Sequence, residues 1–329
     1  MPRLPRTAIP VALLVLLVLT LAACGGGEAT PSPSGDAAQD GRPSIVVTTT
    51  VLGDVVGQLV QQDADVEVLL PVGADAHAFT PSAAQAEAVR AADLLVTNGG
   101  DLEEGLLDAI EAAEEDGVRV VHALDHVDVI EFGADDDHAE APEDGHEDGH
   151  DHDGADPHFW TDPLRMADVV TALGEALADS DDRDIDWAAR ADDLAGQLEA
   201  VDAEVVEILD AVPDARRRLV TNHDALGYFA DRYGFEVVAT VIPGATTLAE
   251  PSAADLDEVV HAIEEAGVPA IFAETSAAPR LAEVVAQEVG GDVEVVTLHT
   301  ESLSEPDGPA ATYEDLLRSN ATAIAEALG

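Results

Sequence analysis

Short apolar segments that alternate with helical patterns restrict this chain to an α/β fold. Eight segments are rich in β-branched residues, and most do not alternate between apolar and polar positions. Such strands are buried on both faces, which is typical of parallel sheets covered by helices. In chain order they are IVVTTT, VEVLL, LLVTN, VRVVH, RLVTN, VVATV, AIFAE and VEVVTL. Four precede and four follow a long helical region. We therefore predict two lobes, each a mostly parallel four-stranded sheet flanked by helices.

The helical region between the two sets contains one long amphipathic helix, predicted over 186–212. Its apolar residues recur at alternating steps of four and three and form one stripe: Trp187, Ala191, Leu194, Leu198, Val201, Val205, Ile208 and Val212. At 1.5 Å per residue this helix would be roughly 40 Å long, and Pro213 should end it. We expect it to join an N-terminal lobe at 44–185 to a C-terminal lobe at 213–329. A coiled-coil dimer helix is the alternative.

The N-terminus carries an export signal. Arg3 and Arg6 precede an apolar run that ends in Leu21-Ala22-Ala23-Cys24. This ending resembles the bacterial lipobox, in which the cysteine is acylated and becomes the first residue of the mature protein. We predict a signal peptide at 1–23, lipidation at Cys24 and a flexible tether at 24–43, rich in Gly, Pro and Ser. The protein would then be extracytoplasmic and lipid-anchored to the cell membrane. A signal anchor with an unmodified cysteine is the alternative.

The charge balance excludes one class of partner. The chain has 68 acidic residues and 14 basic ones, all arginine, for a formal net charge of −54. Such a surface repels nucleic acid, so we expect no nucleic-acid partner. It attracts cations in general, although a solvated acidic surface needs no specific metal to explain it.

A low-complexity segment at about 134–156 is made almost entirely of His, Asp, Glu, Gly and Ala, and we expect a disordered surface loop there. Part of it, HEDGH, spells the H-E-x-x-H signature of zinc proteases. That motif works only on a packed helix, and here glycines interrupt the run without an apolar anchor, so we reject a protease. The loop can still bind metal weakly. The auxiliary, low-affinity ligands would be His138, His146, His150 and His152. A merely solvated acidic loop is the alternative.

Three other histidines lie in connections where the ligand sites of open α/β sheets collect. His77 follows the strand at 66–70, and His223 follows the strand at 218–222. His158 precedes a helix for which Asp162 is the expected N-cap and Pro163 the first residue. A lone loop histidine is usually a surface residue. Three at such connections, from both halves of the chain, favour a site in a cleft.

The chain resembles the zinc- and manganese-binding lipoproteins of bacterial ABC uptake systems over essentially its whole mature length. The matching stretches, in family order, are PVGADAHAFTPS, VTNGGDLEEGLLDA, DPHFWTDP, TNHDALGYFADRYGF, EPSAADL, IFAE and TESLSEPDGPAATYEDLLRSNATAIAEAL. The resemblance implies two lobes joined by one backbone helix, with a metal in the cleft between them. The implied ligands are His77 and His158 from the first lobe, His223 from the second, and a carboxylate that aligns with Glu301.

Two positions depart from the family pattern. The fourth ligand is more often aspartate in the family, so Asp307 is the reserve candidate for Glu301. In NGGDLEEGLL, Gly105 replaces an aromatic residue usual there, which we expect to weaken packing without affecting the site.

Three imidazoles and one carboxylate suit four-coordinate Zn²⁺. Mn²⁺ prefers more oxygen ligands, and manganese members of the family typically carry glutamate where this chain has His223. The His-rich loop upstream of His158 is also a feature of the zinc members. We therefore predict Zn²⁺ as the transported ligand, with Mn²⁺ or iron as the alternative. Imidazole ligation also predicts that binding weakens as the pH falls through about 6.5.

The leading function is capture of Zn²⁺ outside the cell and its delivery to the membrane permease of an ABC transporter, by a monomer that is not an enzyme. A metallohydrolase is a competing class, but catalytic zinc keeps an open position for water, which a fourth protein ligand would close. A third class is a cell-adhesion lipoprotein whose metal only stabilises the fold.

Overall fold

Two parallel four-stranded sheets organise the protein. The computed structural model describes residues 42–131, 154–181, 183–244, 246–276, 280–290 and 293–329. In the first sheet, β1 (Ser44–Val47) lies between β2 (Asp65–Val68) and β3 (Leu94–Thr97), and β4 (Arg119–His122) pairs with β3. Each pairing is parallel, as the unbroken apolar runs predict.

The second sheet repeats the order of the first. Its inner strand β5 (Arg218–Thr221) lies between β6 (Glu236–Thr240) and β7 (Ala270–Glu274), and β8 (Glu294–Leu298) pairs with β7. In both sheets the chain passes from the first strand to its neighbour on one side (β1 to β2, β5 to β6), and then crosses to the neighbour on the other side (β3, β7). Such a switch point opens a crevice at the carboxyl ends of the strands, where ligands of α/β proteins bind.

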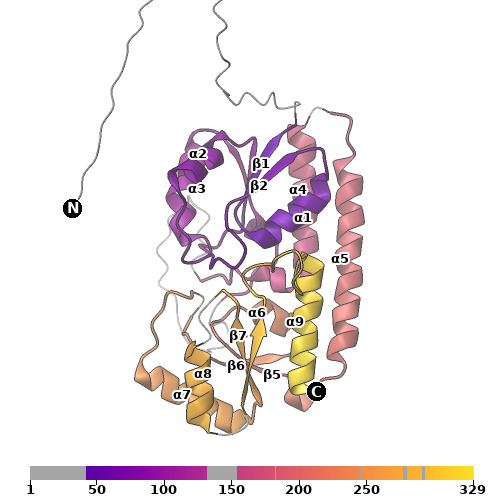
Figure 1. Ribbon diagram of the computed structural model, residues 1–329. Coiled ribbons are helices and arrows are strands. Elements are labelled where there is room, and N and C mark those ends of the chain that lie inside the picture. Colours follow the sequence, from indigo (N-terminus) through magenta and orange to yellow (C-terminus); the bar gives the residue numbers. More distant parts are fainter. Residues whose placement is uncertain (1–41, 132–153, 182, 245, 277–279, 291–292) are drawn as a thin grey trace, which may run out of the picture. The chain divides into compact units, whose positions relative to one another are not determined.

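Helices cover the sheets, as Figure 1 shows. In chain order they are α1 (Thr50–Val60), α2 (Ala83–Ala91), α3 (Leu107–Glu115), α4 (Pro163–Ser180), α5 (Trp187–Leu209), α6 (Gly227–Tyr233), α7 (Ala253–Ala266), α8 (Arg280–Val289) and α9 (Tyr313–Leu328). Short 3₁₀ turns are η1 (Glu104–Leu106), η2 (Ala123–His126), η3 (Phe159–Thr161) and η4 (Asp214–Arg216). Asp162 caps α4 by accepting from the Leu164 amide, with Pro163 in the first turn, as the sequence predicts.

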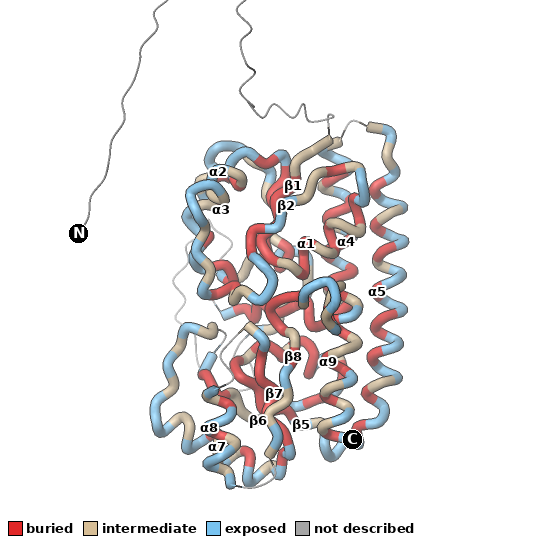
Figure 2. Tube along the Cα trace, in the orientation of Figure 1, coloured by how far each residue is buried: buried red, intermediate tan, exposed pale blue. Residues whose placement is uncertain are grey.

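The long helix α5 runs beside both sheets (Figure 1). Its predicted apolar stripe, apart from the partly buried Ile208, is buried against α4 and α9 of the same chain, and one core cluster continues from the first lobe into the second (Figure 2). The intramolecular packing leaves no stripe for a coiled-coil partner, so that alternative is wrong. The helix ends at Leu209, earlier than the expected end at 212.

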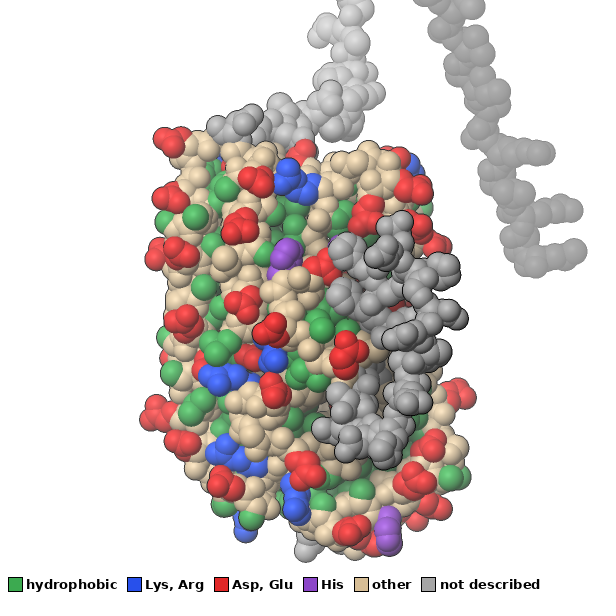
Figure 3. Space-filling view, turned by 180° about the vertical axis from the view of Figure 1, so that it is seen from behind, with side chains coloured by type: hydrophobic (Ala, Val, Ile, Leu, Met, Phe, Trp, Pro, Cys, Tyr) green, Lys and Arg blue, Asp and Glu red, His purple; other side chains and the backbone are tan. Residues whose placement is uncertain are grey.

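The exposed surface is acidic. The face in Figure 3 carries scattered Asp and Glu side chains with few arginines between them. Among the described residues, no helix combines the length and apolar character that a bilayer crossing requires. The predicted signal peptide, Cys24 and nearly all of the tether lie outside the described residues, as do His138, His146, His150 and His152.

Candidate metal centre

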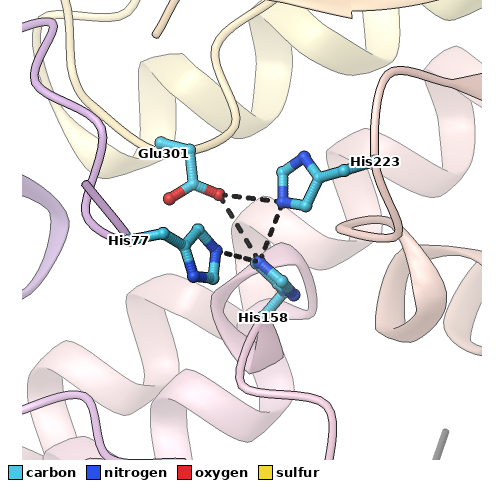
Figure 4. Close-up of side chains that lie close together, drawn as sticks. All are labelled: His77, His158, His223 and Glu301. Atoms are coloured by element: carbon cyan, nitrogen blue, oxygen red, sulfur yellow. Dashed lines mark hydrogen bonds and ion pairs between the residues drawn. The ribbon is translucent and has the colours of Figure 1, made fainter. Parts of the chain in front are cut away.

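Four side chains named from the sequence meet in one buried cluster (Figure 4). His77 comes from the connection after β2, His158 from the turn before η3, His223 from the connection after β5, and Glu301 from the segment after β8. All four are at most 4% exposed. One ligand atom from each lies within 4.8 Å of all the others. Asp307, the reserve candidate, is exposed and outside this cluster.

Four of the distances among these ligand atoms are close to those in a tetrahedral zinc site. His158 Nε2 lies 3.4 Å from His77 Nε2, 3.2 Å from His223 Nε2 and 3.5 Å from Glu301 Oε1. His223 Nε2 lies 3.6 Å from the same carboxylate oxygen. A tetrahedral zinc ion with bonds of 2.0–2.1 Å separates its ligand atoms by about 3.4 Å. The described donors therefore fit the coordination shell of Zn²⁺.

Carboxylates orient two of the three imidazoles. His158 Nδ1 is 2.7 Å from Asp156 Oδ1, and His223 Nδ1 is 2.5 Å from Glu274 Oε1. A proton held at Nδ1 by such a carboxylate leaves the Nε2 lone pair free and pointed into the cluster. Gly227, in the first turn of α6, makes room for one of these carboxylates, because a Cβ there would lie 2.6 Å from Asp156 Oδ2.

His77 is held differently. Its backbone amide donates to Asp75 Oδ1 at 3.0 Å, which fixes the turn that carries it. Its ring Nδ1 lies 4.0 Å from Glu104 Oε1, beyond hydrogen-bonding distance. The turn of His77 is therefore fixed more firmly than its ring.

Glu301 is fixed through its neighbours rather than through its own side chain. Trp160 Nε1 donates to the Thr300 carbonyl at 2.7 Å, and Ser302 Oγ accepts from the Gly73 amide at 2.8 Å. Both oxygens of Glu301 are buried without a hydrogen-bond partner among the described residues. A buried carboxylate without donors is costly, and a bound cation removes that cost. The C-terminal segment thus brings to the cluster a carboxyl group whose two oxygens have no hydrogen-bond partner among the described residues.

Burial sets the protonation of the cluster. Desolvation lowers the pKa of His77 to about 3 and that of His158 well below its usual value, so both are neutral near pH 7. Burial opposes charge on His223 too, but the carboxylates of Glu274 and Glu301 outweigh it and raise its pKa to about 9. Burial also raises the pKa of Glu301 to about 8. The raised pKa values of these two neighbouring groups mean that the cluster retains protons that compete with a cation.

Asp156 and Glu274 were not among the residues named from the sequence. The expected disordered loop extended to Asp156, but Ala155 and Asp156 are buried, and Ala155 forms an antiparallel bridge with Glu131. That loop boundary is wrong. The D-P-H spacing was a usable signal for Asp156, because a carboxylate two residues before a histidine can reach its Nδ1. Glu274 carries no such local signal.

Gly105 also differs from the expectation. The glycine was expected to weaken packing, but a Cβ there would overlap the Phe79 carbonyl oxygen. The backbone of η1 instead packs directly on the segment that follows His77. The missing side chain allows close packing at this position.

Comparison with known proteins finds relatives that are named as metal-binding proteins. The profile of the family described as "Zinc-uptake complex component A periplasmic" matches residues 45–327. The zinc-binding protein TroA of Treponema pallidum is 32% identical over 282 residues, covering 85% of this chain and 86% of the relative. The manganese-binding lipoprotein MntA of Halalkalibacterium halodurans is 25% identical over 308 residues, covering 93% and 94%.

A solved structure agrees with the fold. The periplasmic zinc-binding protein TroA from Treponema pallidum superposes with a TM-score of 0.76 at 28% identity, covering 88% of this chain and all of that chain. The family profile spans both sheets and the helix between them. The chain therefore belongs to the family of periplasmic zinc-uptake component A proteins.

Proposed function

We propose that this protein captures Zn²⁺ outside the cell through His77, His158, His223 and Glu301 and delivers it to the membrane permease of an ABC uptake system. The observation that carries the proposal is the buried set of three imidazole nitrogens and one carboxylate oxygen, all within 4.8 Å of one another. Membership of the zinc-uptake family supports the transport role.

The set of donor atoms favours a protein that binds and transports the metal over a metallohydrolase. Catalytic zinc keeps one position open for water, and here a fourth protein ligand takes that position. Every donor comes from a buried side chain, so the bound ion would be enclosed. These features suit a cargo that is held and released unchanged.

Manganese is the second candidate, and one observation favours it. Glu301 Oε2 has no hydrogen-bond partner among the described residues, so the carboxylate can offer both oxygens to one ion. A bidentate carboxylate would raise the coordination number toward that preferred by Mn²⁺. The name of the relative MntA, a manganese-binding lipoprotein, supports this second candidate.

Elemental analysis tests the proposal. Protein purified without added metal, then equilibrated with equal Zn²⁺ and Mn²⁺, should carry one tightly held zinc per chain. A His158→Ala variant treated in the same way should lose it. Manganese in excess of zinc would establish the second candidate, and undiminished zinc in the variant would refute the ligand set.

The proposed cellular arrangement is a lipid anchor at Cys24, after cleavage of residues 1–23, with the tether at 24–43 between membrane and lobes. The relative MntA of Halalkalibacterium halodurans is named a lipoprotein, which supports this arrangement. Intact mass of the protein from its native host should show an acylated Cys24, and Cys24→Ser should release the protein from the membrane fraction.

A further inference from the structure

His77 differs from the other two histidines in its surroundings. Each of the others has a buried carboxylate within hydrogen-bonding distance of Nδ1. The carboxylate nearest to His77 Nδ1 is that of Glu104, at 4.0 Å, and Glu104 is partly exposed. Asp75 therefore fixes the backbone turn of His77, and Glu104 lies beside its ring without a hydrogen bond to it.

Both of these carboxylates are hydrogen-bonded by consecutive residues of the second lobe. Thr247 Oγ1 donates to Asp75 Oδ2 at 2.7 Å, and Thr246 Oγ1 donates to Glu104 Oε1 at 2.9 Å. The two threonines lie in the connection between β6 and α7, far from His77 in sequence. We call these four residues, Asp75, Glu104, Thr246 and Thr247, the clasp.

The clasp reaches the metal ligand through Asp75. Asp75 Oδ1 accepts from the backbone amides of His77 and Ala78, while Oδ2 accepts from Thr247. One carboxylate thus joins the turn that carries His77 to a hydroxyl of the opposite lobe. If the hydroxyl is removed, Asp75 keeps its two backbone hydrogen bonds but loses the bond that ties the turn of His77 to the second lobe.

Close packing on the other side keeps Glu104 in place. It begins η1, and the next residue is Gly105, whose missing side chain lets η1 contact the Phe79 carbonyl. Glu104 therefore lies against the same loop that carries His77. The outer bond from Thr246 to Glu104 is exposed and should contribute less than the half-buried bond from Thr247 to Asp75.

We propose that Thr246 and Thr247 are positioning residues that hold His77 in the closed site and thereby slow the loss of zinc. The proposal rests on the proposed function, since it takes His77 as a zinc ligand. Because the clasp joins the two lobes and fixes the turn that carries His77, breaking it should loosen this ligand and ease the release of zinc. Loss of the clasp should therefore raise the dissociation rate more than it changes the association rate.

The test uses two substitutions at one position. Thr247→Val keeps the shape of the side chain and removes the hydroxyl, whereas Thr247→Ser keeps the hydroxyl. Zinc release into excess chelator, followed by stopped flow, should be about tenfold faster in Thr247→Val and near the parent rate in Thr247→Ser. The association rate should change less than twofold in both. Thr322→Val, an exposed threonine on α9 whose hydroxyl bonds its own helix, is the matched control.

A double-mutant cycle separates this role from a general structural one. In a His77→Ala background, Thr247→Val should no longer change the release rate, because the ligand that it positions is gone. Equal release from Thr247→Val and the parent, or an unchanged effect in the His77→Ala background, would overturn the proposal. Failure of the proposed function looks different, because His77→Ala itself would then leave zinc affinity intact.

Discussion

The two sheets share one strand order but differ in how they satisfy the polar groups at their switch points. In the first sheet the crevice is filled by Glu103, a buried carboxylate that accepts from Thr48 Oγ1, the Asn98 amide and the Gly99 amide. The chain itself supplies the donors. Nothing further is needed to satisfy this carboxylate.

The second switch point leaves several buried polar atoms of the described residues unpaired. Among the described residues, Glu274 Oε2, both oxygens of Glu301 and the side-chain polar atoms of Asn222 are buried without partners. Asn222 follows β5 as Asn98 follows β3, in the matching sequences RLVTN and LLVTN. The same strand order therefore supports a fully hydrogen-bonded structural carboxylate at one switch point and, at the other, carboxylate oxygens without hydrogen-bond partners beside the proposed ligands. The difference lies in where the chain supplies hydrogen-bond donors.

The largest expected effect is the loss of a proposed ligand at the second switch point. His223→Ala should weaken zinc binding by more than about a hundredfold, because three remaining donors leave an incomplete tetrahedron. Competition titration with a zinc chelator measures the change. An affinity within tenfold of the parent would remove His223 from the ligand set.

Lower pH should weaken zinc binding, because protons compete with the ion at His223 and Glu301. The raised pKa values of His223, about 9, and Glu301, about 8, mean that the metal-free site holds protons at pH 7 that zinc must displace. Affinity should therefore rise with pH up to about 9 and fall about tenfold per pH unit below it for each displaced proton. This window lies above the value of 6.5 expected from unperturbed histidines.

Titrations from pH 6 to 9 check this window, and Glu274→Gln sharpens it. Loss of the carboxylate beside His223 should lower the pKa of that imidazole and move the rise in affinity to lower pH. A parent affinity that is flat above pH 7 would contradict the raised pKa values.

The first switch point should affect stability rather than binding. Glu103→Gln replaces one accepting oxygen with an amide group that cannot accept, so the metal-free protein should lose about 1–3 kcal/mol of unfolding free energy. Zinc affinity should change less than threefold. Urea denaturation and chelator competition on the same sample measure both quantities.

Glu301→Gln is the matched substitution in the second crevice and should show the reverse pattern. It should weaken zinc binding without lowering the stability of the metal-free protein. If the two variants behaved alike, the contrast between the crevices would be wrong.

The smallest effect is expected outside both crevices. Deletion of 135–153 should leave the tight zinc site in place, because His77, His158, His223, Glu301 and their hydrogen-bond partners all lie outside it. A weaker class of sites, from the four auxiliary histidines, should disappear. Calorimetric titration of the deletion variant separates the two classes, and loss of the tight site would place the loop within it.

Much of the fold follows from local patterns. The unbroken apolar runs predicted all eight strands, and the stripe from Trp187 predicted α5, because burial on two faces or on one stripe leaves a direct trace in the sequence. The extent of α5 was less accurate, since the last turn before Pro213 leaves the helix at Leu209.

Only part of the candidate site could be predicted from the sequence. The four proposed ligands came from motif resemblance, whereas the partners that orient them depend on contacts between distant segments. Glu274 is 51 residues from His223, and Thr247 is 172 residues from Asp75. No periodicity encodes such pairs, because strand order brings them together only after the sheets form.

The shared core along α5 has a thermal consequence. Because α4, α5 and α9 bury one continuous cluster that belongs to both lobes, wide separation of the lobes would expose apolar surface, and exposure of apolar surface raises heat capacity. Exchange of the ion by movement of only a few side chains would expose almost no apolar surface. Zinc release rates plotted against temperature should therefore follow a straight Arrhenius line, with an activation heat capacity near zero.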